Sequence, residues 1–186
     1  MKKKFNLKWL FVIVPIIAVL VFTLIAFLLP KDEEVELKKV EYITKDNRTS
    51  FSFYEDFSKK EVGEYDLYAS KKNKQIIGVF TYNLNEYEEN SSKEILENQI
   101  KYFLDTRKDM KLFKKETTIE MDDKIITKVE YSGKTDNSSD CVYIFSVIDF
   151  KADTNYVVYS NEVIIKDDYE NNIGEMIDIL KSAKLN

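Results

Sequence analysis

The sequence contains no histidine, one cysteine, two prolines and four glycines in 186 residues. Without histidine, Ser-His-Asp and Cys-His catalysis, histidine-ligated zinc or haem, and an imidazole pH switch are all excluded. The single cysteine, Cys141, cannot form an internal disulfide, and the alternating apolar residues around it predict a small buried side chain. Gly-rich phosphate loops and the patterns Cys-x-x-Cys and Gly-x-Ser-x-Gly are also missing. The composition therefore favours a protein that is not an enzyme.

Charged residues are absent from one long run, residues 9–30. As a helix, residues 9–29 would span roughly 31 Å, close to the thickness of the hydrocarbon core of a bilayer. Four lysines precede the run, whereas Lys31 is followed directly by three acidic residues. By the positive-inside rule, the leader 1–8 lies in the cytoplasm and the chain after the run lies outside. We therefore predict a single-pass signal anchor at 9–29 in the cell membrane, followed by an extracytoplasmic domain.

A cleaved signal peptide is the alternative for this segment. Its apolar region is usually about 7 to 15 residues long and ends in small residues at the cleavage site. Here the apolar run is longer and ends in Phe27-Leu28-Leu29-Pro30, and no cysteine follows it for lipid attachment. An uncleaved anchor is therefore favoured. The abundance of Lys, Asn, Ile and Tyr, together with the short Lys-rich leader, favours a bacterial cell-surface protein.

The rest of the chain is acidic. Without the four leader lysines, 24 basic residues stand against 33 acidic ones over residues 31–186, a net charge of −9. This balance argues against a nucleic-acid partner. Residues 30–48, in which charges alternate with Val and Leu, are interpreted as a tether. Residues 49–186 are long enough to form one domain with a core of its own.

The strands of this domain are predicted from alternating patterns rich in β-branched and aromatic residues. Residues 56–64 are expected to form a loop. Because the connections are short, neighbouring strands should pair in antiparallel fashion. The expected strands are 49–54, 65–70, 75–83, 116–121, 124–132, 141–150 and 156–165.

Two helices are expected to pack on the sheet. The first, 91–108, opens with the capping-box pattern Ser91-x-x-Glu94, and the second, 168–184, closes the fold. The predicted fold class is α+β, an N-terminal transmembrane helix followed by an antiparallel sheet of about six strands with two packing helices. The apolar faces are Ile95, Leu96, Ile100, Phe103 and Leu104 in the first helix, and Tyr169, Ile173, Met176, Ile177, Leu180 and Ala183 in the second.

The order of elements and several stretches resemble the PsbP-like fold, which includes an extrinsic subunit of the plant photosystem and many bacterial surface domains. The stretches that carry the resemblance are Phe51-Ser52-Phe53-Tyr54, residues 77–82 before the Ser-capped helix, residues 128–133 and residues 156–160. Where the family has Pro-x-x-Trp after the first strand, this sequence has Glu55-Asp56-Phe57. Over residues 49–185, the resemblance implies an α/β sandwich that docks onto larger assemblies rather than a catalyst.

Acidic residues gather at 88–89, 122–123, 167–168 and in the loop 136–140. Carboxylates from several loops could coordinate Ca²⁺ if the loops converge. Turn formation and helix capping explain the same residues and are favoured, because no Asp-x-Asp-x-Asp-Gly loop is present. A glycosidase with paired carboxylates is a further possibility, but no pair stands out.

The remaining candidates for a functional site are the tyrosines, of which the sequence has twelve, and one basic turn. Tyrosines in or beside strands could line a binding surface or fill half-buried sheet positions, and the structural role is favoured. The segment Lys71-Lys72-Asn73-Lys74 could contact an anionic wall polymer or lipid headgroups, although a solvated hairpin turn is favoured. The tyrosines concerned are Tyr65, Tyr68, Tyr82, Tyr87, Tyr143, Tyr156 and Tyr159.

The sequence thus favours a non-catalytic, membrane-anchored binding or accessory domain that docks on another envelope protein. The alternative is an extracytoplasmic sensor for a small ligand or cation, with the acidic loops 122–123 and 136–140 as its place to bind. An enzyme is the third hypothesis. We assign no catalytic, cofactor-binding or metal-binding residue, and the expected partners are the membrane, through 9–29, and an envelope protein.

Overall fold

The computed structural model describes residues 38–63, 65–70, 74–107 and 109–186. Every described residue belongs to one compact unit. The predicted leader, the predicted anchor and the first part of the predicted tether lie outside the described residues. Within the described part, no helix is long and apolar enough to cross a membrane.

A seven-stranded antiparallel sheet, counted over the described residues, forms the centre of the domain, in the order β3-β4-β5-β9-β8-β7-β6. A second, three-stranded sheet has the order β1-β2-β10. In the main sheet the strands are β3 (Phe57–Val62), β4 (Tyr65–Ser70), β5 (Gln75–Asn83), β6 (Lys111–Glu120), β7 (Lys124–Lys134), β8 (Asp140–Phe150) and β9 (Tyr156–Ile165). In the small sheet they are β1 (Lys39–Ile43), β2 (Thr49–Tyr54) and β10 (Lys184–Leu185).

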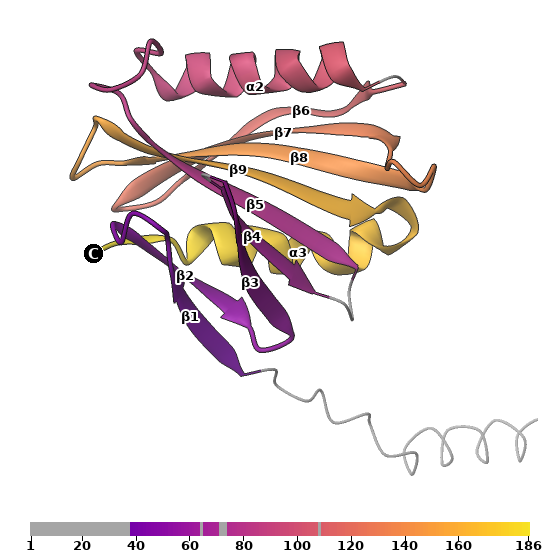
Figure 1. The fold of residues 1–186 in the computed structure, drawn as a ribbon, viewed down its shortest axis with the longest axis horizontal. Coiled ribbons are helices and arrows are strands. Elements are labelled where there is room, and N and C mark those ends of the chain that lie inside the picture. The colour runs from indigo at the N-terminus through magenta and orange to yellow at the C-terminus, as the bar shows by residue number, and fades with distance from the viewer. Residues whose placement is uncertain (1–37, 64, 71–73, 108) are drawn as a thin grey trace, which may run out of the picture. The chain divides into compact units, whose positions relative to one another are not determined.

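Helices cover both faces of the main sheet (Figure 1). On one face α2 (Ser92–Thr106) lies against β8 and β9. On the other face, a 3₁₀ turn (Lys166–Asp168) leads into α3 (Tyr169–Lys181), which contacts both β9 and β2. The small sheet therefore shares the α3 side of the main sheet, and the domain has three layers.

Two separate cores follow from this arrangement, because successive side chains of a strand point to opposite faces. On β9, Val158 and Ile164 belong to the core beneath α3, whereas Val157 and Tyr159 belong to the core beneath α2. Both faces of the central strands are therefore buried. This explains why 141–150 are apolar almost without interruption and why 156–165 carry apolar residues on both faces.

The start of α2 confirms half of the predicted capping box. The hydroxyl of Ser91 accepts a hydrogen bond from the backbone N–H of Glu94 at 3.3 Å. The Glu94 carboxylate in turn accepts from the backbone N–H of Asn90 at 2.7 Å, one residue earlier than the standard pattern requires. The first helix is thus confirmed, ending two residues before the predicted Lys108.

The predicted tether 30–48 is wrong over its second half. Residues 39–43 form β1, which pairs along its whole length with β2. Tyr42 packs edge-on against Phe53 and Tyr68, with ring centroids 5.7 and 5.6 Å away, and its hydroxyl donates to the carbonyl of Phe57 at 3.0 Å. Charged residues occupy the outward positions of this edge strand, and that alternation gave it the appearance of a tether.

Three further expectations about the elements need correction. The predicted loop 56–64 contains β3, whose first residue, Phe57, is buried against Phe53. The main sheet has seven strands among the described residues, one more than the expected six or so, and a second sheet accompanies it. The last helix ends at Lys181 and not at 184, because residues 184–185 leave it to pair with β2.

We expect Tyr42→Ala to lower the free energy of unfolding by about 2–4 kcal/mol, since it removes a large aromatic side chain packed between rings. The measurement is urea denaturation followed by circular dichroism. Ile43→Ala is the matched control, because the neighbouring side chain points outward and is half exposed, and it should change stability by less than about 0.5 kcal/mol. Equal stability of the two variants would contradict the assignment of β1 to the folded domain.

Candidate functional site

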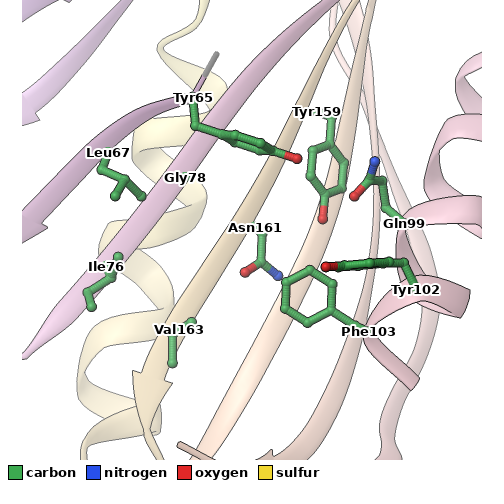
Figure 2. A pocket seen from close by; sticks show the side chains of 10 residues that line it. All are labelled: Tyr65, Leu67, Ile76, Gly78, Gln99, Tyr102, Phe103, Tyr159, Asn161 and Val163. Atoms are coloured by element: carbon green, nitrogen blue, oxygen red, sulfur yellow. The ribbon is translucent and has the colours of Figure 1, made fainter. Parts of the chain in front are cut away.

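A hollow opens between α2 and strands β4, β5 and β9. Its volume is about 450 Å³, within the range of small-molecule and side-chain binding pockets. Figure 2 shows how the side chains around it are arranged. The hollow is lined by Tyr65 and Leu67 of β4, Ile76 and Gly78 of β5, Gln99, Tyr102 and Phe103 of α2, and Tyr159, Asn161 and Val163 of β9.

The hollow exists because the sheet is wider than the helix that covers it. Helix α2 lies on β8 and β9, and leaves part of the same face of β4 and β5 open. Gly78 adds to the open space, because it presents no side chain on the floor. A Cβ atom at this position would meet the Leu67 Cδ2 atom at 3.5 Å and the Asn161 carbonyl oxygen at 3.8 Å, both ordinary contacts. There is therefore room for a Cβ atom at 78, and the glycine keeps the floor free.

The polar groups of the hollow are uncharged. Tyr159 is 1% exposed, and its hydroxyl has no hydrogen-bond partner among the described residues. Burial raises the pKa of Tyr159 well above its ordinary value, so the hydroxyl stays protonated. Gln99 donates to the hydroxyl of Tyr82 at 2.9 Å, and Asn161 donates to the carbonyl of Ile144 at 3.5 Å. One buried hydroxyl at the floor thus lacks a hydrogen-bond partner, although its oxygen exposes almost no surface to the hollow.

The rim of the hollow is apolar and exposed. Tyr102 of α2 is 64% exposed on one side, and Ile76 of β5 is 47% exposed on another. In Figure 2 the polar ends of Tyr65, Tyr102, Tyr159 and Asn161 turn toward the same central region. An apolar entrance with a few polar groups directed inward is the usual construction of a binding pocket.

A second polar group of side chains lies on the opposite face of the sheet, beneath α3, and is buried except for Lys114 at its edge. The Tyr169 hydroxyl donates to Glu130 at 2.5 Å and accepts from the ammonium of Lys114 at 2.8 Å. Glu130 also forms an ion pair with Lys128. Each polar member has a charged or hydrogen-bonding partner, so this cluster fixes the position of α3 on the sheet rather than presenting a binding group.

Glu162 lies in the same buried layer, on β9. Ser160 donates to its carboxylate at 2.7 Å and Ser146 at 3.4 Å. Burial raises the pKa of Glu162 to about 7 from an ordinary value of 4.5, although the two serine hydroxyls and the nearby charge of Lys128 act in the opposite direction. Glu162 therefore changes charge near neutral pH inside the core.

The acidic residues singled out from the sequence do not converge. No group of three or more His, Cys, Asp or Glu side chains within the described residues could hold a metal ion. Asp123 lies in the turn between β6 and β7, where its carboxylate accepts from Lys124 at 2.8 Å, and this hydrogen bond lowers its pKa. Asp136 forms an exposed ion pair with Arg107 at 3.0 Å. Turn formation, the interpretation favoured from the sequence, accounts for the acidic residues of both loops.

The remaining acidic pairs are 167–168 and 88–89. Asp168 precedes α3 but makes no side-chain capping hydrogen bond, so the capping role considered for 167–168 is not observed. Glu89 accepts a hydrogen bond from Asn98 of α2 at 3.2 Å. Cys141 is fully buried as predicted, and burial raises the pKa of its thiol. Of the basic turn, residues 71–73 lie outside the described residues.

The tyrosines divide into structural and accessible ones. Five of the seven are buried, in line with the favoured structural interpretation, but one of these, Tyr159, also lines the hollow. Tyr87 is 40% exposed, and Tyr65 lines the hollow as well. Tyr102, the most exposed aromatic residue of the hollow, was not among the candidates. Gly78 within a strand pattern was the one available signal, because such a glycine often marks a close approach to the backbone. The five buried tyrosines are Tyr68, Tyr82, Tyr143, Tyr156 and Tyr159.

No protein-family model matches the chain, and no curated protein matches its sequence. Solved structures do share its fold. Cyanobacterial PsbP (CyanoP) from Synechocystis sp. PCC 6803 has 9% identity and a TM-score of 0.58, and the match covers 85% of this chain and 99% of that one. The Ran-binding protein Mog1p of Saccharomyces cerevisiae has 12% identity and a TM-score of 0.53, covering 80% and 96% of the two chains.

A third structure of the same fold is LpqN of Mycobacterium tuberculosis, which is involved in cell envelope biogenesis. It has 8% identity and a TM-score of 0.53, over 81% of this chain and 92% of its own. The protein is therefore an α+β sandwich with the PsbP-like fold, as the sequence predicted. At identities this low the likeness shows the fold alone.

As the pH rises from 4.5 through 7, we expect the free energy of unfolding of the protein to fall by about 3 kcal/mol more than that of its Glu162→Gln variant. The folded state holds a proton on Glu162 in this window, whereas the unfolded state has lost it, so rising pH favours unfolding. The measurement is denaturant unfolding at several pH values. Glu120→Gln is the control, since its carboxylate is 74% exposed. Parallel pH profiles of the protein and Glu162→Gln would contradict the expectation.

Proposed function

We propose that the protein is a non-catalytic, membrane-anchored binding domain that docks on another protein of the cell envelope through the hollow beside α2. The observation that carries this proposal is the exposed apolar rim of the hollow, formed by Tyr102 and Ile76 around an uncharged interior. Exposed apolar groups around a concave surface gain free energy when a partner covers them.

The structures of similar fold support a role in protein binding. Mog1p is a Ran-binding protein, and LpqN is involved in cell envelope biogenesis. These properties belong to those proteins. They show that a PsbP-like sandwich can serve as a binding domain, and they agree with the hypothesis drawn from the sequence.

The edges of the main sheet favour contact through side chains over the addition of a partner strand. At one edge, β6 carries Lys111, Lys114 and Lys115 and contains two register shifts against β7. At the other edge, β3 carries Lys59 and Lys60. Lysines and bulges on edge strands oppose pairing with another chain. The hollow is therefore the better docking surface.

The predicted anchor supports a partner close to the membrane. Between the end of the predicted helix at 29 and the start of β1 at 39 lie nine residues. Even fully extended, they reach roughly 30 Å. A domain on a connection of this length meets other membrane proteins and proteins bound at the membrane surface.

The proposal is tested by photocrosslinking in membranes of the source cells, with the full-length chain carrying a benzophenone amino acid at position 102 or at position 104. Leu104 is the matched control, because it is 41% exposed on the same helix but about 200° around the helix axis from Tyr102. We expect one protein to crosslink at 102 in clear excess over 104, and Ile76→Ser to reduce that product severalfold. Equal products at the two positions, or no reproducible product at 102, would overturn the proposal.

A further inference from the structure

The floor of the hollow contains an unused hydrogen-bonding group. The Tyr159 hydroxyl is buried without a partner among the described residues, and burial of an unpaired polar group is unfavourable. A hydroxyl both donates and accepts, so it can pair with either an acceptor or a donor. The oxygen exposes almost no surface, so a bound group reaches it only when the lining side chains move aside. A polar atom brought to this point then removes the unfavourable state.

The lining of the hollow also disfavours a charged occupant. None of the ten lining residues is Asp, Glu, Lys or Arg. An ionised group in the hollow would lose hydration without gaining a partner of opposite charge. Three aromatic rings from α2 and β9 and one from β4 surround the space, and they favour a flat apolar group through edge and stacked contacts. The occupant is therefore uncharged and aromatic, with one polar atom.

The exposed rim indicates that the occupant extends beyond the hollow. A free small molecule that fits the interior would leave Tyr102 and Ile76 in water, whereas a side chain carried on a protein brings a surface that covers them. At about 30 Å³ per water molecule, the volume corresponds to roughly fifteen waters, so the space accepts a whole aromatic side chain and part of its backbone. Displacement of weakly held water by such a group favours binding.

We infer that the envelope partner inserts one uncharged aromatic side chain with a polar edge, tryptophan or tyrosine, into the hollow, where it hydrogen-bonds to the Tyr159 hydroxyl. This inference rests on the proposed docking function and adds the chemistry by which the partner is recognised. Gly78 leaves the space for the ring, and Tyr159 selects for its polar atom.

Two variants test separately the space left by Gly78 and the hydrogen bond to the Tyr159 hydroxyl. Gly78→Val fills the floor, and we expect the strand to tolerate it because a Cβ at this position makes only ordinary contacts. Tyr159→Phe removes the unpaired hydroxyl and keeps the ring, so stability should stay the same or rise. A loss of binding in either variant is therefore a property of the site and not of unfolding, which thermal denaturation verifies.

The test uses the isotope-labelled full-length chain in lipid nanodiscs, titrated with N-acetyl-tryptophanamide and N-acetyl-tyrosinamide and followed by NMR. We expect one or both to shift the signals of Gly78 and Val163, and to bind at least tenfold more tightly than indole-3-propionate, which carries a charge, and N-acetyl-leucinamide, which has no ring. Gly78→Val should weaken binding more than tenfold, and Tyr159→Phe by about two- to tenfold. Unchanged affinity in Gly78→Val would overturn the inference.

The outcomes also distinguish this inference from the docking proposal. Crosslinking at 102 that survives in Gly78→Val overturns the aromatic insertion and leaves the docking function standing. Loss of the crosslink in Gly78→Val, with tryptophanamide acting as a competitor, supports both. If the amides fail to bind while neutral naphthalene binds in the hollow and no partner crosslinks, the hollow is a small-ligand site, and both proposals are overturned.

Discussion

The pairing of β9 between β5 and β8 is the constraint on which the rest of the structure depends. Its register is continuous on both sides, from Gln75↔Ile164 to Asn83↔Tyr156 and from Cys141↔Ile165 to Asp149↔Val157. Because side chains alternate along a strand, this register assigns every second residue of β9 to α3 and the others to α2. A slip of one residue would exchange the two cores and place the Glu162 carboxylate in the hollow.

The two faces of β9 therefore have different roles, one in stability and the other in binding. Toward α3 the strand presents apolar side chains and the buried Glu162, whose carboxylate accepts hydrogen bonds from Ser160 and Ser146. Toward α2 it presents Tyr159, Asn161 and Val163, which line a space that no helix of the described residues fills. On the first face the hydrogen bond from Tyr169 to Glu130 holds α3 on the sheet, whereas the open face has an unpaired hydroxyl and an exposed rim. Stability and binding are thus located on opposite sides of one strand.

The sequence predicted those parts that local patterns determine. Residues 141–150 are almost continuously apolar, residues 156–165 begin and end with apolar runs, and α2 begins at a recognisable Ser cap, so these two strands and the first helix were found. Strands β1 and β3 were missed because charges fill their outward positions, and β10 because two residues carry no periodic pattern. The hollow depends on tertiary placement, since nothing in the sequence distinguishes the exposed Tyr102 from the buried Tyr159. In the sequence, only Gly78, a glycine within a strand, indicated the position of the hollow.

The small sheet has a consequence for the order in which the domain folds. Its central strand, β2, is held on one side by β1 and on the other by β10, and the backbone N–H of Asn186 donates to the carbonyl of Arg48 at 2.9 Å. The core beneath α3 is thus closed by β1 and β10, two strands that lie far apart in the sequence. Contacts between such distant segments form late, because closing the long stretch of chain between them costs conformational entropy. We therefore expect the small sheet to be completed after the hairpins of the main sheet have formed.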